Sequence, residues 1–256
     1  MDILDLFLPK GVKCIFCDME TKDYGICEEC YNKLPFIEGN TCHKCGAKML
    51  GDGYVCVECK NKKTFVDRNY AVLNYNDMIK PKVISFKQGG LKYIGDAFAN
   101  LIREKYNNIS ENIDIIIPVP ISKNRLKSRG FNQTEILCNE LQELNKIRTD
   151  VLYRPEDTPH QTGLDRKNRL ANLKGAFKVK DKKLVEGKSI LLIDDIYTTG
   201  TTLNECAGVL KSAGATKVYG LVLARAMFRI DKVLGKEKQT IEDKVTALAV
   251  SGNKVN

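Results

Sequence analysis

Residues 191–203 read LLIDDIYTTGTTL, and this stretch gives the clearest indication of the fold class. Its apolar residues end abruptly at two adjacent carboxylates, Asp194 and Asp195, and a threonine-rich segment leads into a helical pattern that begins near Leu203. A buried strand that passes through a short loop into a helix has this pattern. Because open parallel sheets bind ligands beyond the carboxyl ends of their strands, the stretch predicts a binding site at this strand end.

The loop and the acid pair suit two different parts of one ligand. The loop consists of Thr198, Thr199, Gly200, Thr201 and Thr202. Its hydroxyls and N–H groups face whatever ligand sits at the N-terminus of the following helix, where the macrodipole favours an anion such as a phosphate monoester. The carboxylates cannot share that phosphate, so they must hold sugar hydroxyls or a magnesium ion. A ribose 5-phosphate with its 2′ and 3′ hydroxyls on the acids satisfies both halves.

Alternating strand and helix patterns extend outward from this stretch. Strands are expected over residues 65–75, 114–120, 151–154, 189–193 and 217–226. Apolar residues recur at helical spacing from Ile94, and Leu137, Leu141 and Leu144 mark a second helix. The alternation predicts an α/β fold with an open, mostly parallel sheet.

A basic segment follows the strand over residues 114–120. It contains Lys123, Arg125, Lys127 and Arg129 within the sequence ISKNRLKSRGFNQ. An isolated charge run of this kind is usually a solvated face. This one leaves the same edge of the sheet as the acid pair, so we expect it to supply cations to a pyrophosphate group.

Cysteines dominate the first sixty residues. Eight of the ten cysteines fall there, in the pairs CIFC, CEEC, CHKC and CVEC. Two thiolates at C-x-x-C spacing lie on one turn and face a common ion, so two such turns complete a tetrahedral four-cysteine zinc site. Disulfides and iron are the alternatives, although cytosolic thiols stay reduced. The expected ligands are Cys14, Cys17, Cys27, Cys30, Cys42, Cys45, Cys56 and Cys59.

Turn residues indicate how the pairs combine. The gaps between successive pairs are 9, 11 and 10 residues long, which does not distinguish consecutive from interleaved ligation. Gly25 in the first gap, and Gly51 and Gly53 in the third, favour hairpin reversals there. The middle gap contains the apolar residues 34–37 and looks like a connector with its own small core. We therefore predict two consecutive ribbons, each folded by about 10 kcal/mol of metal-binding free energy.

Length and composition fit a soluble globular protein of two domains. The chain has 256 residues, and no apolar run approaches the ~20 residues of a membrane span. Acidic residues at the N-terminus, MDILDLFLPK, argue against a secretory signal, so we expect a cytoplasmic protein without membrane insertion. The formal net charge of +9 favours a polyanionic ligand, either a phosphate compound or nucleic acid. The expected parts are a zinc-ribbon module (1–62), the sheet domain (63–226) and an extension of unreadable role (227–256).

The motifs resemble a known family when they are taken together. LLIDDIYTTGTT is similar to the signature of type I phosphoribosyltransferases, which bind 5-phosphoribosyl 1-diphosphate (PRPP). The cysteine pairs, PVP, RGFNQ and the spaced pattern from Gln161 through Arg169 to Phe177 resemble the ComF (competence protein F) family over about residues 1–226. The resemblance implies a double zinc ribbon, a phosphoribosyltransferase domain and a link to DNA uptake in competent bacteria.

The family resemblance does not settle whether a reaction is catalysed, but it indicates which reaction to expect if the domain is an enzyme. Pyrophosphate would leave C1 of PRPP, with Mg²⁺ and the basic residues Arg125, Lys127 and Arg129 stabilising it. Residues 155–169, with Gln161 and Arg169 as substrate contacts, would form a lid that excludes water. Thr198 stands where the 6-oxopurine enzymes carry an additional Asp, which disfavours purine salvage. The acceptor of the ribosyl group is not readable from the sequence.

A non-catalytic role is the alternative hypothesis. In it the PRPP fold senses a ligand, while the ribbons bind single-stranded DNA or a DNA-uptake ATPase or helicase. Tyr31, Phe36 or Tyr54 would stack on bases. Phosphate contacts would come from Lys60, Lys62, Lys63, Lys80, Lys82, Lys87 and Lys92.

Overall fold

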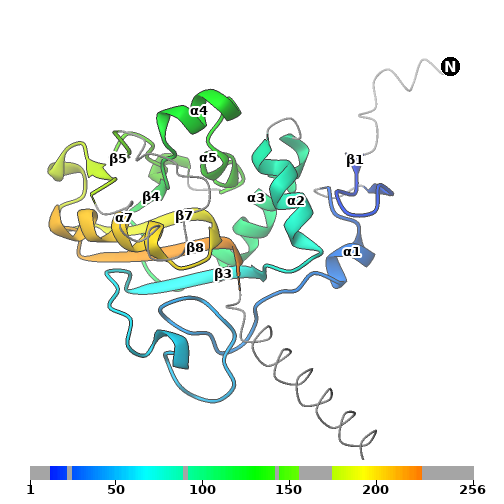
Figure 1. Ribbon diagram of the computed structural model, residues 1–256, viewed down its shortest axis with the longest axis horizontal. Helices are drawn as coiled ribbons and strands as arrows, with labels where there is room; N and C mark the ends of the chain where they lie inside the picture. The colour runs from blue at the N-terminus through cyan, green and yellow to red at the C-terminus, as the bar shows by residue number, and fades with distance from the viewer. Residues whose placement is uncertain (1–11, 22–24, 89–91, 142–143, 156–174, 227–256) are drawn as a thin grey trace, which may run out of the picture. The chain divides into compact units, whose positions relative to one another are not determined.

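The structure, a computed structural model, describes residues 12–21, 25–88, 92–141, 144–155 and 175–226. A four-stranded sheet in the order β3-β8-β7-β4 lies at its centre, and each neighbouring pair is parallel (Figure 1). The strands are β3 (Arg68–Asn74), β4 (Ile115–Pro118), β7 (Ser189–Tyr197) and β8 (Lys217–Arg225). The predicted open parallel sheet is confirmed.

The strand that decides the fold lies inside this sheet, between β8 and β4. It pairs with β8 from Ser189↔Lys217 to Tyr197↔Arg225, and with β4 up to Pro118↔Ile193. Neighbours on both sides and cover on both faces explain its continuous apolar run, SILLI. Because all four strands are parallel, their carboxyl ends meet at one edge of the sheet.

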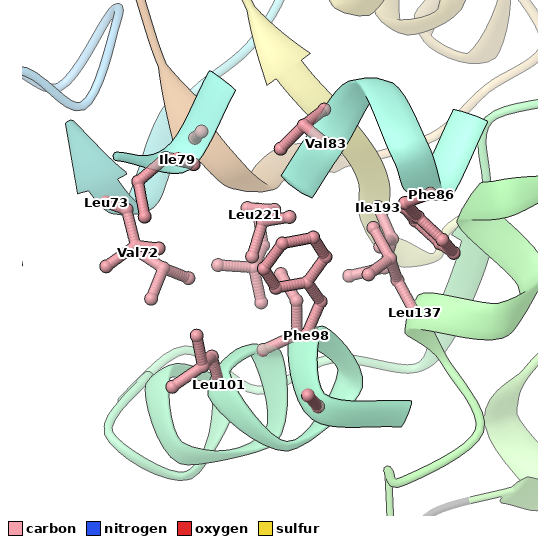
Figure 2. Packing of buried hydrophobic residues seen from close by; sticks show 14 of the residues in the cluster. Val72, Leu73, Ile79, Val83, Phe86, Phe98, Leu101, Leu137, Ile193 and Leu221 are labelled. Carbon is pink, nitrogen blue, oxygen red and sulfur yellow. The ribbon is translucent and has the colours of Figure 1, made fainter. Parts of the chain in front are cut away.

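Three helices cover one face of the sheet. They are α2 (Ile79–Gln88), α3 (Lys92–Asn107) and α5 (Gln133–Leu137). Phe86 of α2 and Phe98 of α3 meet edge to face, with ring centroids 5.8 Å apart, above Leu221 of β8 and Ile193 of β7 (Figure 2). Helix α3 confirms the spacing that starts at Ile94, whereas α2 was not predicted.

Helix α7 (Thr201–Ser212) packs on the opposite face. The helix predicted to begin near Leu203 is confirmed, and its buried side includes Leu203, Cys206, Ala207 and Leu210. A two-stranded antiparallel ribbon of β5 (Leu152–Tyr153) and β6 (Lys178–Val179) adds Leu152 to the same core. The strand predicted over 151–154 therefore exists, but it lies outside the main sheet.

The helix predicted through Leu137, Leu141 and Leu144 is wrong in its extent. Helix α5 ends at Leu137, and a separate 3₁₀ turn, η3, spans Leu144–Lys146. Bonds of the i→i−3 type, such as Cys138 N to Glu135 O at 3.0 Å, tighten the chain and end the helix. The buried positions of Leu137 and Leu141 produce the helical spacing without a continuous helix.

The basic segment forms a short helix, α4 (Lys123–Arg129). Ser122 caps its N-terminus by accepting a hydrogen bond from Arg125 N at 3.5 Å, and Gly130 closes its C-terminus with a left-handed φ of 81°. The helix starts shortly after β4 ends, so α4 lies at the carboxyl edge of the sheet, as expected.

The cysteine-rich residues carry little regular structure. They contain β1 (Val12–Lys13), paired antiparallel with β2 (Glu20–Thr21), then α1 (Glu28–Asn32) and the 3₁₀ turn η2 (Val57–Cys59). No helix in the described part of the chain is long and apolar enough to cross a membrane.

The connector between the two cysteine groups has no core of its own, contrary to expectation. It runs antiparallel beside β3: Phe36 forms a bridge with Leu73, and Ile37 N donates to Val72 O at 2.8 Å. Leu34 and Ile37 are buried in the cores on either side of the sheet. The connector packs there because β3 is an edge strand with unpaired backbone groups on its outer side.

Candidate ligand site and cysteine groups

The acid pair lies near the carboxyl end of β7 and is linked to two helices. Asp195 Oδ2 accepts hydrogen bonds from Lys87 Nζ of α2 at 2.9 Å and from Gln133 Nε2 of α5 at 3.0 Å. Gln133 Oε1 in turn accepts from Arg129 Nη1 of α4 at 2.9 Å. A continuous set of polar contacts therefore joins the acid pair to the basic helix.

Both carboxylates are largely buried, with Asp194 9% and Asp195 5% exposed. Asp194 Oδ1 accepts from the backbone N of Asp195 at 2.8 Å. Burial, followed by the charge of Asp195, raises the pKa of Asp194 to about 7. Two neighbouring buried acids disfavour full ionisation of both, so an added cation or hydrogen-bond donor would stabilise the ionised pair.

The threonine loop wraps tightly before α7. Gly200 precedes the helix with φ 79°, in the left-handed region that glycine adopts without strain. Thr199 Oγ1 lies 2.8 Å from Thr201 Oγ1 and accepts from Thr201 N at 3.4 Å. Thr198 is exposed, and Thr202 is half-buried. The first N–H groups of a helix have no intrahelical acceptor, so this loop presents donors to an anion.

Helix α4 brings the predicted cations to the same edge. Arg125 and Arg129 are half-buried, whereas Lys127 is exposed. Burial, then the neighbouring charge of Arg125, lowers the pKa of Arg129, while Asp195 opposes this. The charges of the arginines and of the acid pair therefore affect one another's pKa values, which is common among residues of a functional site.

Two residues of this site were missed from the sequence. From the sequence, Lys87 is placed among the expected DNA contacts, and Gln133 lies in the RGFNQ motif without a predicted role. The signal for Gln133 was its place directly after the basic segment. Lys87 lies in an unpredicted helix and gave no signal. Two predicted substrate contacts, Gln161 and Arg169, and most of the proposed lid (155–169) lie outside the described residues.

The cysteines form the two groups predicted, Cys14/17/27/30 and Cys42/45/56/59, and within each group all ligand atoms lie within 4.8 Å of one another. The Sγ atoms of Cys17 and Cys27 are 3.6 Å apart, and those of Cys45 and Cys56 are 3.8 Å apart. Tetrahedral zinc with Zn–S bonds of about 2.3 Å separates its sulfurs by about 3.8 Å. The residues therefore fit zinc, and ligation is consecutive.

The second cysteine group is attached to the ends of two central strands. Arg225, the last residue of β8, directs Nη2 to Cys45 Sγ at 3.5 Å and to Glu58 Oε2 at 3.2 Å. Tyr197, the last residue of β7, donates from its hydroxyl to Lys44 O at 3.3 Å. This group therefore lies beside the threonine loop that follows Tyr197.

A parallel sheet with an acid pair and a threonine-rich loop at its carboxyl edge is typical of a phosphoribosyltransferase-type α/β domain, here preceded by two four-cysteine groups. The chain belongs to the phosphoribosyl transferase domain family, whose model matches residues 91–251. A model of the double zinc ribbon domain matches residues 3–61.

Curated relatives match this chain over nearly their whole length. The chain is 29% identical over 245 residues to "Competence protein ComFC" of Bacillus subtilis (strain 168), a match that covers 83% of this chain and 95% of that protein. It is 27% identical to "Competence protein F" of Haemophilus influenzae over 84% of this chain and 97% of the relative. "DNA utilization protein YhgH" of Escherichia coli O6:H1 is 28% identical, with 84% of this chain and 97% of the relative covered. The predicted resemblance to the ComF family is confirmed.

Proposed function

We propose that this protein binds PRPP with Mg²⁺ at the carboxyl edge of its sheet and acts in DNA uptake or utilisation. The observation that carries the proposal is the set of contacts from Asp195 through Gln133 to Arg129. It connects an acid pair suited to a ribose diol with cations suited to a pyrophosphate. The role in DNA uptake rests on the names of the relatives, which describe competence and DNA utilisation.

Each part of PRPP has a partner of suitable chemistry. The loop from Thr198 to Thr202 binds the 5-phosphate through hydroxyls and the N–H groups that begin α7. Asp194 and Asp195 accept hydrogen bonds from the 2′ and 3′ hydroxyls. The basic helix α4, with Arg125, Lys127 and Arg129, faces the pyrophosphate. Asp194 and Asp195 would also suit a Mg²⁺ ion bound with PRPP, which would supply further positive charge to the pyrophosphate.

In the ligand-free protein, Lys87 compensates the negative charge of the acid pair. Its ammonium lies 2.9 Å from Asp195 Oδ2, so it offsets a negative charge that would otherwise be uncompensated in a nearly buried position. A diol that occupies the carboxylates frees this cation to move toward the pyrophosphate. Lys87 therefore belongs to the ligand site and not to a DNA-binding surface.

In a catalytic cycle, the bond from C1 to the pyrophosphate oxygen breaks with its electron pair on the leaving group, and an acceptor nucleophile bonds to C1. Arg125 and Arg129 stabilise the departing charge, and the loop and acids hold the sugar in place. A screen for pyrophosphate release across candidate acceptors tests this step. Binding without release in any acceptor supports the non-catalytic alternative, in which PRPP is a sensed ligand.

Calorimetry tests the ligand site directly. Asp194→Asn/Asp195→Asn should abolish the heat of PRPP binding in the presence of Mg²⁺. The matched control, Asp150→Asn/Asp181→Asn, removes two acids that contact Arg148 and the backbone N of Lys183 outside this site. The control should bind as the wild type does. Equal heats in the acid-pair variant and the wild type would rule out the sugar assignment.

The raised pKa of Asp194 predicts a pH dependence with a definite sign. An ionised carboxylate accepts the diol hydrogen bonds, so PRPP affinity should rise with pH through about 7. Fold stability should change in the opposite direction, because a raised carboxyl pKa stabilises the unfolded state as pH increases from about 4 to 7. In Asp194→Asn both dependences should weaken; a pH-independent affinity in the wild type would contradict the assignment.

Single-stranded DNA binding by the second ribbon is a second candidate function. Tyr54 there is 72% exposed, and Lys60 nearby is exposed too. Tyr31 is unsuitable because its hydroxyl donates to Glu104 at 2.6 Å and its ring packs against Phe36. Oligonucleotide affinity should fall steeply with salt and should weaken in Tyr54→Ala. If no oligonucleotide binds even at low salt, the protein does not contact DNA directly. Its role in DNA uptake would then depend on a partner protein, such as an uptake ATPase or helicase.

The proposal also includes the domain boundaries and the cellular compartment. Residues 1–62 form the zinc ribbons, 63–226 the PRPP domain, and 227–256 an extension outside the described residues. We infer a cytoplasmic location from the eight free thiols gathered in the two cysteine groups, since a reducing compartment keeps such thiols available for metal.

A further inference from the structure

The ring of Tyr197 lies directly beneath the threonine loop. A Cβ atom built on Gly200 would be 2.2 Å from the Tyr197 hydroxyl oxygen, and Gly200 has a left-handed φ of 79°. The loop therefore folds down onto this ring as closely as a glycine permits. Tyr197 is also only 7% exposed, so its side chain has a defined place in the core.

The same side chain reaches the second cysteine group. Its hydroxyl donates to the carbonyl oxygen of Lys44 at 3.3 Å, and Lys44 lies inside the CHKC turn that supplies two of the four ligands. Lys44 Nζ donates to Cys59 O at 3.2 Å and to Lys62 O at 2.5 Å, which ties the two turns of the group together. Tyr197 thus contacts both the loop and the turn that binds metal.

A second residue, Arg225 at the end of β8, also links the sheet to the second cysteine group. Arg225 is the register partner of Tyr197 and is 2% exposed, with its guanidinium directed at Cys45 Sγ and Glu58. Four thiolates around one Zn²⁺ carry a net charge of about −2, so a buried cation at this place is electrostatically matched to a metal-loaded group. The backbone N of Ala226 then donates to Tyr197 O at 2.9 Å, joining the two strand ends.

We propose that the second cysteine group positions the phosphate-binding loop through Tyr197, and that metal in this group and phosphate on the loop stabilise each other. The inference rests on the proposed phosphate-binding role of the loop. Tyr197 is a positioning residue, since it contacts the loop and not the proposed ligand. Coupling between two sites is reciprocal, so each ligand must tighten the binding of the other.

The first cysteine group provides the internal control. Its residue Gly25 approaches Ala97 of α3, and Ile15 and Ile26 pack in the core on the opposite face from α7. In the described part of the chain, no hydrogen bond joins this group to residues 197–204. Metal in the first group should therefore leave the phosphate loop unaffected.

Hydrogen exchange of the full-length, zinc-loaded protein tests the positioning without any ligand. In Tyr197→Phe, amides of residues 199–203 should exchange about fivefold faster, as expected for loss of one hydrogen bond, while both zinc ions remain bound. Tyr153→Phe, at a half-exposed tyrosine of β5, is the matched control and should leave this exchange unchanged. Equal exchange in all three proteins would overturn the proposal.

Zinc release to a chelator tests the reciprocal effect. Cys17→Ser lacks one ligand of the first group, so its remaining zinc reports on the second. Ribose 5-phosphate should slow release of this zinc at least about threefold, and Tyr197→Phe in the same background should remove the slowing. Unchanged release from a protein that calorimetry shows to be saturated would overturn the coupling. Absence of any ribose 5-phosphate binding would instead defeat the proposed function, and the exchange experiment would still decide the role of Tyr197.

Discussion

The two cysteine groups share one sequence pattern but have different surroundings. In the first group Cys14 and Cys30 are buried but Cys17 is exposed, and the apolar neighbours of the group pack against α3. In the second group Cys42, Cys45 and Cys59 are fully buried, and Arg225 lies against the sulfur of Cys45. Equal ligand sets therefore lie in different environments. The first group packs on the α3 side, whereas the second contacts the carboxyl ends of β7 and β8 through Tyr197 and Arg225.

Removing one ligand from each group should give the largest contrast. Cys45→Ser removes a fully buried zinc ligand and one partner of Arg225, which keeps its ion pair with Glu58, so the loss of metal binding and of this charged contact should together lower the free energy of unfolding by about 3–5 kcal/mol. Cys17→Ser removes an exposed ligand and should release one zinc with a smaller loss of stability. Chemical denaturation and metal analysis of both variants measure this. Equal losses would show that the two groups support the fold alike.

Replacing the guanidinium tests the electrostatic part of the comparison. Arg225→Met keeps much of the side-chain volume but removes the charge near Cys45, so zinc affinity of the second group should fall about 10–100-fold. The first group should keep its affinity. Arg148→Met, which removes a surface arginine paired with Asp150, is the control. Competition with a calibrated chelator measures both affinities, and a uniform fall in the two groups would refute a specific role for Arg225.

A glycine with positive φ in each cysteine group provides a further contrast in how closely the two groups pack. Gly46 of the second group has φ 71°, and a Cβ there would lie 3.0 Å from Ala71 N of β3. Gly25 of the first group has φ 77°, but its nearest neighbour would be 3.4 Å away. Both alanine variants carry about 1–2 kcal/mol of left-handed strain, and Gly46→Ala adds a clash with backbone of about 1–3 kcal/mol. Thermal unfolding should therefore rank Gly46→Ala as the less stable variant.

The smallest effect belongs to an ion pair beside the first group. Lys33 Nζ lies 2.5 Å from Glu29 Oε1 on the surface of α1, and both side chains are mostly exposed. Solvent screens such a pair, so Lys33→Ala should leave the unfolding temperature unchanged within error. A clear loss of stability would mean that the first group is more tightly integrated than its surroundings indicate.

Patterns that depend on local chemistry could be predicted well. The strand–loop–helix around Asp194 follows from an apolar run and a threonine-rich turn, and the pairing of cysteines follows from glycines in two of three gaps. Both features are encoded in short, continuous stretches of sequence. The periodic face of α7, with Leu203 and Leu210 buried, is equally local.

Features that depend on distant contacts could not be predicted. Lys87 and Asp195 are far apart in the sequence, and nothing near Lys87 indicates its partner. Leu141 is buried in the main core, although α5 has already ended, so its helical spacing was misleading. The connector at Phe36 looked independent because its partner, Leu73, is defined only by the edge of the assembled sheet.

Backbone pairing by that connector has a consequence for any shortened form of the protein. Ile37 N donates to Val72 O and Asn74 N donates to Pro35 O, both at 2.8 Å, so residues 35–37 occupy the outer side of β3. A truncated chain that begins at residue 63 would expose this hydrogen-bonding rim together with Leu73. Uncovered edge strands pair with the strands of other chains, so the ribbon module also protects the sheet against self-association and aggregation.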